Sequence, residues 1–249
     1  MKTKGDKLKE AYGRIIVAMD VPSLSAAVSL AEKLLGRVGC LKVGKELFTA
    51  SGMEVVTELC GMGLPVFLDL KFHDIPQTVM GAARSAGRLG VAMFTVHSSG
   101  GAEMVAQAVK GAAEGAREGG QKPPLVLAVT VLTSIDQKIY NEIGFSGSLE
   151  EGVRRLAKLA KGAGAGGIVC SPNEIEIVRE SVGERLKIVT PGVRPQGSEK
   201  GDQKRTMTPA EAIRKGADFL VIGRPITKAG DPQAAVEEIA EEIATALQT

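Results

Sequence analysis

The sequence has little of what several large protein classes need. Its 249 residues include no tryptophan, 3% aromatic residues, two histidines and three cysteines. With so few aromatic side chains, a stacking platform for nucleic-acid bases is not expected. The cysteines (Cys40, Cys60 and Cys170) are odd in number and far apart, which is typical of a reduced, cytoplasmic chain. Because the sequence has no Cys/His cluster, we expect no zinc site.

Charge and hydropathy argue against two further classes. The formal net charge is only +2, which does not favour a nucleic-acid or membrane surface as a partner. No apolar run approaches the ~18 residues of a membrane span. The first ten residues are rich in charge and lack an apolar stretch, so no secretory signal is expected. The 44% of hydrophobic residues fits a globular protein with a full-sized core.

Strand-like and helix-like segments alternate along the chain. Short apolar runs predict eight strands, at 14–20, 40–44, from 66 onward, 93–97, 125–132, 167–170, 186–190 and 218–223. Helical segments separate them, including 23–36, 53–60, 78–89, 100–118, 149–161, 209–215 and 231–247. Strands that are apolar throughout are buried on both faces and pair in parallel. Eight such units predict a single-domain α/β fold over residues 1–249, a (β/α)8 TIM barrel, with a doubly wound sheet as the alternative.

Polar residues fall at the ends of the predicted strands, where a barrel carries its active site. They are Asp20, Lys42, Asp69, Lys71, His97, Thr133, Arg194 and Arg224. Since side chains alternate along a strand, Asp69 and Lys71 should point the same way. We expect a charge-compensated network of Lys42, Asp69, Lys71 and Asp74, in which each group shifts its neighbour's pKa. The alternative is a buried ion pair that fixes strand register.

The end of the eighth predicted strand indicates an anion site. Gly223 lets backbone N–H groups approach an anion, and the guanidinium of Arg224 can clamp a phosphate. A left-handed turn that carries a surface arginine is the alternative. The polar segment 192–207 is longer than a connection needs, so we expect it to close over a bound phosphate. His73 and His97 are candidate general bases, with a structural role beside the charges as the alternative.

Several blocks of the sequence resemble the orotidine 5′-monophosphate decarboxylase family, in its bacterial branch. The run Asp69-Leu70-Lys71-Phe72-His73-Asp74-Ile75-Pro76 is similar to the family signature. Further blocks follow in the family's order, at 18–20, 41–44, 190–195, 201–203 and 221–226. The D-x-K-x-x-D core alone is shared with related sugar-phosphate decarboxylases and synthases, whereas the His-Asp-Ile-Pro extension and the phosphate blocks are specific. Gln77 departs from the family's usual asparagine, a conservative amide change.

The resemblance implies a reaction and a role for each matching residue. The family converts orotidine 5′-monophosphate to uridine 5′-monophosphate and carbon dioxide in de novo pyrimidine biosynthesis, without a metal or organic cofactor. Asp69 would lie against the substrate carboxylate, and Lys71 would protonate C6 of the pyrimidine. Lys42 and Asp20 would hold the ribose hydroxyls and the charge network. Thr133 would face the pyrimidine.

The resemblance also implies a phosphate site and a homodimer. The phosphate would be held by Arg194, Gln203, Gly223 and Arg224. Asp74 and Thr78 would reach into the partner's site, so that two chains build each site. Two other functions stay open from the residues alone. One is a sugar-phosphate decarboxylase or synthase that works through an enediolate on magnesium, and the other is a non-catalytic nucleotide-binding barrel.

Overall fold

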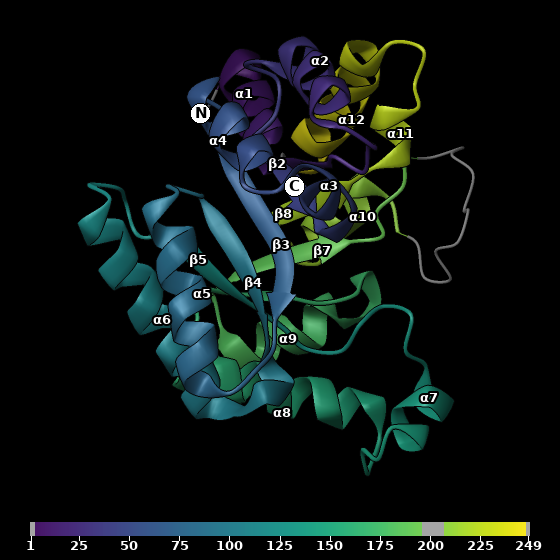
Figure 1. The fold of residues 1–249 in the computed structure, drawn as a ribbon. Coiled ribbons are helices and arrows are strands. Elements are labelled where there is room, and N and C mark those ends of the chain that lie inside the picture. Colours follow the sequence, from purple (N-terminus) through teal and green to yellow (C-terminus); the bar gives the residue numbers. More distant parts are fainter. Residues whose placement is uncertain (1–2, 196–206, 248–249) are drawn as a thin grey trace.

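Eight parallel strands close into a barrel (Figure 1), in the computed structural model that describes residues 3–195 and 207–247. The strands follow one another in chain order around the barrel, and the first pairs with the last. They are β1 (Ile15–Ala18), β2 (Cys40–Gly44), β3 (Val66–Phe72), β4 (Met93–His97), β5 (Leu125–Val129), β6 (Gly167–Val169), β7 (Lys187–Pro191) and β8 (Phe219–Ile222). The prediction of a (β/α)8 barrel is confirmed, and an open doubly wound sheet is excluded.

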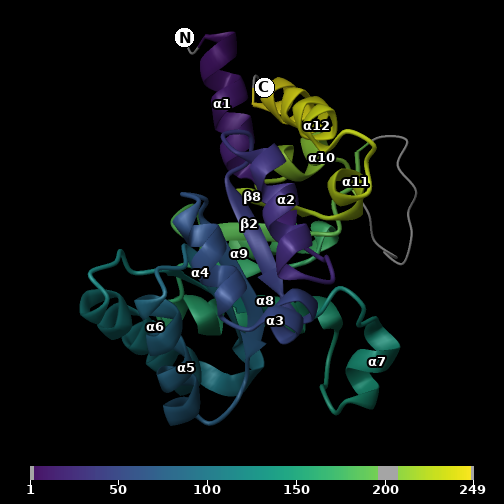
Figure 2. The same ribbon diagram turned by 45° about the horizontal axis from the view of Figure 1, so that its top comes forward.

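Helices surround the barrel and cover the outer face of its strands (Figures 1 and 2). They are α1 (Lys4–Arg14), α2 (Leu24–Leu34), α3 (Lys45–Ser51), α4 (Glu54–Gly61), α5 (Pro76–Arg88), α6 (Gly101–Glu118), α7 (Gln137–Glu142), α8 (Leu149–Gly162), α9 (Ile175–Val182), α10 (Pro209–Arg214), α11 (Arg224–Thr227) and α12 (Pro232–Ala246), with 3-10 turns η1 (Ser98–Gly100) and η2 (Pro172–Glu174). None of these helices is long and apolar enough to cross a bilayer, within the part of the chain that the structure describes.

Local capping explains where the predicted helices begin. The Ser23 side chain accepts a hydrogen bond from the backbone N–H of Ala26 at the start of α2, as expected. Helix α8 begins with a capping box, in which Ser148 and Glu151 satisfy each other's backbone N–H groups. Helices α1, α3 and α11 were not expected. Helix α1 packs beside α12 (Figure 2), and it begins with a capping box of Thr3 and Asp6, a local signal that was missed.

The inward-facing side chains of the strands form a small core of their own. It contains Ile16, Ala18, Cys40, Phe67, Met93, Leu127, Val189 and Val221, all less than a tenth exposed. A larger apolar core lies between the strands and the helices. The barrel interior is therefore packed, and a cavity can open only at its ends.

Helices α5 and α6 lie side by side (Figures 1 and 2) and approach very closely. A Cβ atom added to Gly115 of α6 would lie only 1.9 Å from the carbonyl oxygen of Arg84 in α5. Glycine is thus required at this crossing. The packing of α5 against α6 fixes the start of α5, where Asp74 lies in the preceding turn and Thr78 in the first turn of the helix.

Strand β5 is shorter than expected, ending at Val129 instead of Leu132. Its neighbour β6 has only three residues, so the hydrogen-bonded pairing of β5 with β6 ends at Val129 and Val169. Val131, Leu132 and Thr133 leave the sheet and line a cavity at the mouth of the barrel.

Candidate active site

The polar strand ends meet around a cavity of about 550 Å³ at the C-terminal mouth of the barrel. This volume is within the usual range for a small-molecule site. Eight of the predicted site residues line it: Asp20, Lys42, Asp69, Lys71, Thr133, Arg194, Gly223 and Arg224. Asp74 and Thr78 do not line it and are exposed. Gln203 and most of the expected closing segment 192–207 lie outside the described residues.

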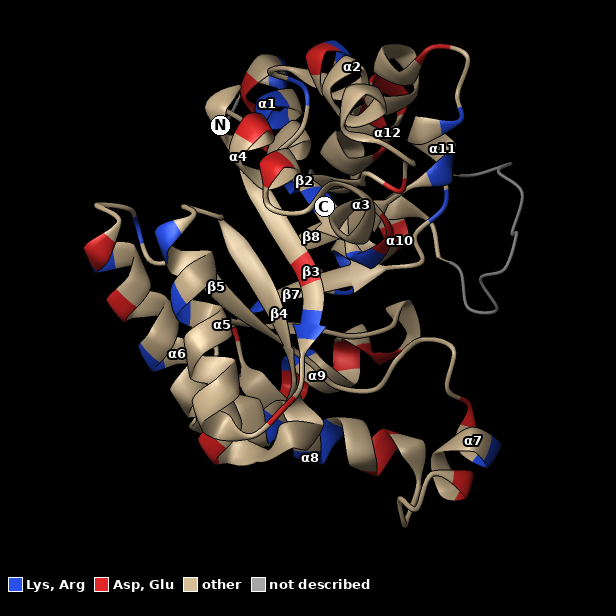
Figure 3. Cartoon of the chain, viewed as in Figure 1, with Lys and Arg blue, Asp and Glu red and all other residues tan. Residues whose placement is uncertain are grey.

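Four charges of alternating sign form a chain across one side of the cavity. The Lys71 ammonium lies 2.8 Å from Oδ1 of Asp69, and the Lys42 ammonium lies 3.7 Å from Oδ2 of the same carboxylate. The Lys42 ammonium also lies 3.4 Å from Oδ1 of Asp20. Figure 3 shows an acidic segment followed by a basic one along β3, and the 2.8 Å contact confirms that the side chains of Asp69 and Lys71 meet.

Within one chain, Asp20 occupies the place in the network that the strand ends had suggested for Asp74, and the resemblance had also implied Asp20 there. The Asp74 carboxylate accepts a hydrogen bond from the backbone N–H of Ile75. It makes no ion pair with any residue in the described parts of the chain. Pro76 begins α5 directly after this turn, and the turn directs Asp74 to the surface.

Asp69 is charged at neutral pH although its side chain is only 13% exposed. Burial alone would raise its pKa. The ammonium groups of Lys71 and Lys42 oppose this effect, as do hydrogen bonds from Lys71 and Thr95, and together they hold the pKa of Asp69 below its usual value. A carboxylate pinned between two cations cannot move or protonate easily, so it fixes the position of both ammonium groups.

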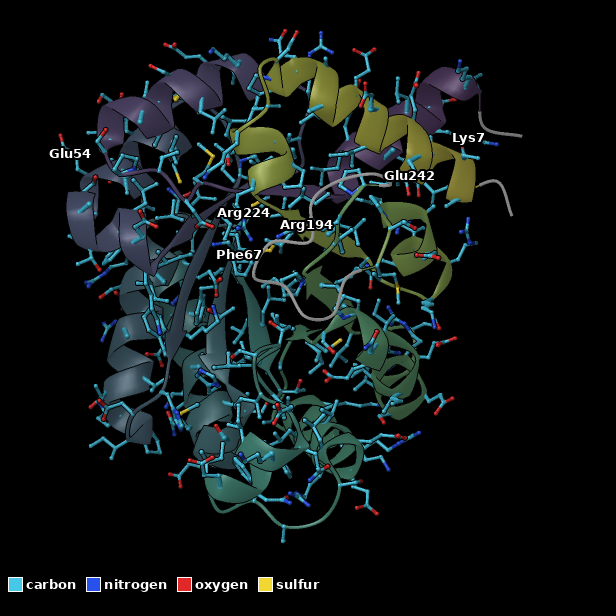
Figure 4. The ribbon with its side chains drawn as sticks, turned by 90° about the vertical axis from the view of Figure 1, so that its right-hand side faces the viewer. Lys7, Glu54, Phe67, Arg194, Arg224 and Glu242 are labelled. Atoms are coloured by element: carbon cyan, nitrogen blue, oxygen red, sulfur yellow. The ribbon has the colours of Figure 1, made fainter. Side chains whose placement is uncertain are left out.

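Two arginines bring a second set of charges to the cavity. Arg194 follows β7 and Arg224 follows β8, and Figure 4 shows them near each other and near Phe67. Burial and the positive charge of Arg224 lower the pKa of Arg194. Two guanidinium groups that repel each other at one cavity wall are suited to a dianion, because its charge would relieve the repulsion.

Gly223 and Arg224 do not form the left-handed turn that was the alternative reading of this segment. Gly223 has φ −110° and ψ −105°, and Arg224 opens the short helix α11. A Cβ added to Gly223 would lie 3.4 Å from that of Ala18 and 3.9 Å from Oδ2 of Asp20. The glycine therefore keeps this side of the cavity open next to the charge chain.

The two histidines lie outside the charged cavity. Their rings are 5.3 Å apart, and both line a neighbouring, mostly apolar cavity of about 360 Å³. Burial and the charges of His73, Lys71 and Lys45 lower the pKa of His97 to about 4. A neutral His97 beside apolar side chains fits the structural alternative, and neither histidine faces the polar cavity as a general base would.

Sequence reasoning missed three polar residues at the site. Glu46 and Lys228 line the cavity, and Thr95 hydrogen-bonds to Asp69 from behind it. Glu46 lies on α3, which begins immediately after β2, and Lys228 follows α11. Both helices are too short to show periodicity. Thr95 had a usable signal, since it is a hydroxyl residue in the middle of an otherwise apolar strand.

Comparisons with known proteins agree with this geometry. The model of the orotidine 5′-phosphate decarboxylase / HUMPS family matches residues 13–239. The chain belongs to this family. A protein from Anaeromyxobacter sp. (strain K) named orotidine 5′-phosphate decarboxylase is 55% identical over 227 residues, covering 91% of this chain and 96% of the relative. One of the same name from Heliobacterium modesticaldum is 51% identical over 96% of this chain and 98% of its own.

A solved structure supports the same assignment. The crystal structure of orotidine 5′-phosphate decarboxylase from Lactobacillus acidophilus superposes with a TM-score of 0.81 at 38% identity. It covers 92% of this chain and 98% of that one. The resemblance predicted from the sequence blocks is confirmed. The curated relatives carry the decarboxylase name, so a sugar-phosphate decarboxylase or synthase is not favoured.

Proposed function

We propose that this chain decarboxylates orotidine 5′-monophosphate to uridine 5′-monophosphate and carbon dioxide, with Lys71 as the proton donor. The observation that carries the proposal is the Asp69–Lys71 pair, held 2.8 Å apart in a cavity that two arginines also line. The chain is thus a carboxy-lyase of pyrimidine biosynthesis. Its substrate offers a carboxylate, a pyrimidine, a ribose and a phosphate, and the cavity has a group suited to each.

The chemistry needs a cation with a proton at the reacting carbon. When the bond from C6 to the carboxylate breaks, its electron pair stays on C6 in an in-plane orbital that the ring cannot delocalise. The Lys71 ammonium, fixed beside C6, stabilises this carbanion as it develops. It then gives its proton to C6, which forms the C–H bond of the product, and water reprotonates the amine.

Asp69 supports both parts of this reaction. Its hydrogen bond holds the Lys71 ammonium in place and keeps it charged. Its own negative charge, fixed between two cations, faces the substrate carboxylate, so departure of carbon dioxide relieves a repulsion. Lys42, Asp20 and Thr133 all line the cavity, and in this proposal the first two bind the ribose hydroxyls while Thr133 contacts the pyrimidine. None of these steps uses a metal ion or an organic cofactor.

The phosphate binds to Arg194, Arg224 and the backbone at Gly223 in this proposal, together with Gln203. Arginine matches phosphate geometry with paired N–H donors. The phosphate is remote from C6, yet its binding energy can be used to hold the pyrimidine against Lys71. The positive charge of Arg224 lowers the pKa of Arg194, and a bound phosphate would offset this repulsion, which supports the assignment.

We also propose a symmetric homodimer in which Asp74 and Thr78 complete the partner's site. Both residues are exposed, and both lie at the turn from β3 into α5 next to the cavity mouth. Ile75 between them is 67% exposed, which is unusual for a large apolar side chain. A two-fold axis near this turn would bury Ile75 and return each Asp74 to the neighbour's cavity. A cytoplasmic location stays a prediction from composition.

Mixing the protein with orotidine 5′-monophosphate and following the orotate absorbance tests the activity. We expect the absorbance to fall at the same rate with and without excess chelator, and uridine 5′-monophosphate to accumulate. Turnover that requires added magnesium would favour the enediolate chemistry of the sugar-phosphate enzymes. Tight binding of uridine 5′-monophosphate without any turnover of the substrate would favour a non-catalytic barrel.

A further inference from the structure

The pairing of β3 with β4 is irregular at the position of the charge chain. Leu68 pairs with Phe94 and Phe72 pairs with Val96, so the three residues 69–71 of β3 face the single residue Thr95 of β4. Bulges of this kind re-aim side chains and are common next to active sites. Lys71 lies within the bulge and has φ +56°, the one positive φ at a non-glycine residue in the described parts of the chain.

The hydroxyl of Thr95 bridges the two reactive residues from behind. It accepts a hydrogen bond from the backbone N–H of Lys71 at 2.9 Å. It donates its own hydrogen to Oδ1 of Asp69, also at 2.9 Å. The same oxygen of Asp69 accepts from the Lys71 ammonium at 2.8 Å. Thr95 is only 1% exposed and does not line the cavity, so it cannot contact a substrate there.

We infer that Thr95 is a positioning residue, whose hydroxyl ties the left-handed backbone of Lys71 to the carboxylate of Asp69 and so sets the direction of the ammonium. The inference rests on the proposed roles of Lys71 and Asp69. A hydroxyl is suited to this position because one atom both accepts from the backbone and donates to a carboxylate. Valine has nearly the same shape but can do neither.

Loss of the hydroxyl has two physical consequences. The partly buried Lys71 N–H would lose its hydrogen-bond partner at a backbone conformation that a non-glycine residue rarely adopts, so the bulge would relax. Asp69 would lose one of the hydrogen bonds that lower its pKa, so its carboxylate would protonate at a higher pH. Both effects act first on Lys71 and Asp69, and the arginines that bind the phosphate stay in place.

The test compares Thr95→Val with Thr95→Ser in the full-length protein. We expect Thr95→Val to lower kcat on the order of 100-fold, because misplacement of a reacting group by about 1 Å costs that much, while KM stays within a factor of a few. The acid limb of its kcat–pH profile should move to higher pH. Thr95→Ser restores the hydroxyl and should recover most of kcat together with the normal pH profile.

A matched control removes a second buried hydroxyl, one that hydrogen-bonds to neither Lys71 nor Asp69. Thr130 is 3% exposed, and its hydroxyl donates to the carbonyl oxygen of Val169 at 3.3 Å. Thr130→Val should keep the wild-type kcat and pH profile. Hydrogen exchange adds a readout that needs no variant, since the Lys71 amide should be protected in the unmodified protein.

Three results would overturn the inference: wild-type kcat in Thr95→Val, an equal loss in Thr95→Ser, or a loss of kcat with an unshifted pH profile. An unprotected Lys71 amide would overturn it as well, even if Thr95→Val does not fold. Lys71→Ala separates this inference from the proposed function. If Lys71→Ala is inactive while Thr95→Val is normal, only the role of Thr95 fails, whereas an active Lys71→Ala refutes the proposed mechanism itself.

Discussion

Gly44, the last residue of β2, has little room for another atom next to the charge chain. A Cβ added there would lie 2.9 Å from Nζ of Lys42 and 3.5 Å from Oδ1 of Asp20. An ordinary contact needs about 3.5 Å, so the ammonium must withdraw by about 0.6 Å. Gly44 has φ −91° and ψ −177°, which alanine adopts without strain. Gly44→Ala therefore acts on Lys42 without disturbing the strand.

The size of the effect follows from two distances. If the separation of Lys42 from Asp69 grows from 3.7 Å to about 4.3 Å, their attraction weakens by about 0.6 kcal/mol at an effective dielectric constant near 20. A misplacement of about 1 Å in an active site can cost about 100-fold in rate, so a shift of about 0.6 Å predicts roughly a tenfold loss of kcat/KM.

Steady-state assays of orotate absorbance should measure this loss against Gly61→Ala. Gly61 ends α4 near the other end of the barrel, and a Cβ added there meets nothing within 4 Å. Urea unfolding should place both variants within about 1 kcal/mol of the wild type, since neither substitution opens a core cavity. Wild-type kcat/KM in Gly44→Ala, or an equal loss in Gly61→Ala, would refute the reasoning.

Arg224→Ala should raise KM more than it lowers kcat, and its preference for uridine 5′-monophosphate over uridine should fall; an unchanged preference would remove Arg224 from the phosphate site. Mixtures of Lys71→Ala with Asp74→Ala should regain up to about a quarter of wild-type activity, because roughly half the dimers are mixed and each mixed dimer has one intact site. Mixtures that exchange subunits but stay inactive would refute the shared site. Because His97 has a pKa of about 4 against its ordinary 6.5, the unfolded chain binds more protons between these values, and stability is lost as pH falls through this window. Between pH 7 and pH 4, His97→Gln should therefore lose about 1–2 kcal/mol less free energy of unfolding than the wild type, after allowance for solvent screening at this partly exposed group. Urea titrations that show the same pH dependence for both proteins would contradict this.

The strands and the grouping of charges at their ends could be predicted from sequence because both depend on local patterns. Apolar runs bounded by glycine and polar residues locate β2 and β4 to the residue. The shared face of Asp69 and Lys71 was also expected, from the alternation of side chains along a regular strand. The real backbone reaches the same contact through a bulge and a left-handed Lys71, which periodicity cannot reveal.

The parts that could not be predicted depend on contacts between distant segments. Asp20 and Asp74 are both acids just beyond a strand end, and the strand pattern alone does not show that Asp20 reaches Lys42 while Asp74 is exposed; only the resemblance had implied this difference. Thr95 lies opposite the bulge because of the pairing register between β3 and β4, and a register depends on two strands at once. Helix α11 has only four residues, too few for a periodic signal of its own, and packing against α12 stabilises it.

The most direct measurement of the central claim is the turnover of Lys71→Ala with orotidine 5′-monophosphate, beside its affinity for uridine 5′-monophosphate. Removing the ammonium takes away both the cation beside C6 and the proton that C6 receives, but leaves Arg194 and Arg224 to bind the phosphate. We predict that kcat falls by several orders of magnitude while product affinity is largely kept. A Lys71→Ala variant that retains even about a tenth of wild-type kcat, a loss of only about 1.4 kcal/mol of transition-state stabilisation, would contradict the mechanism.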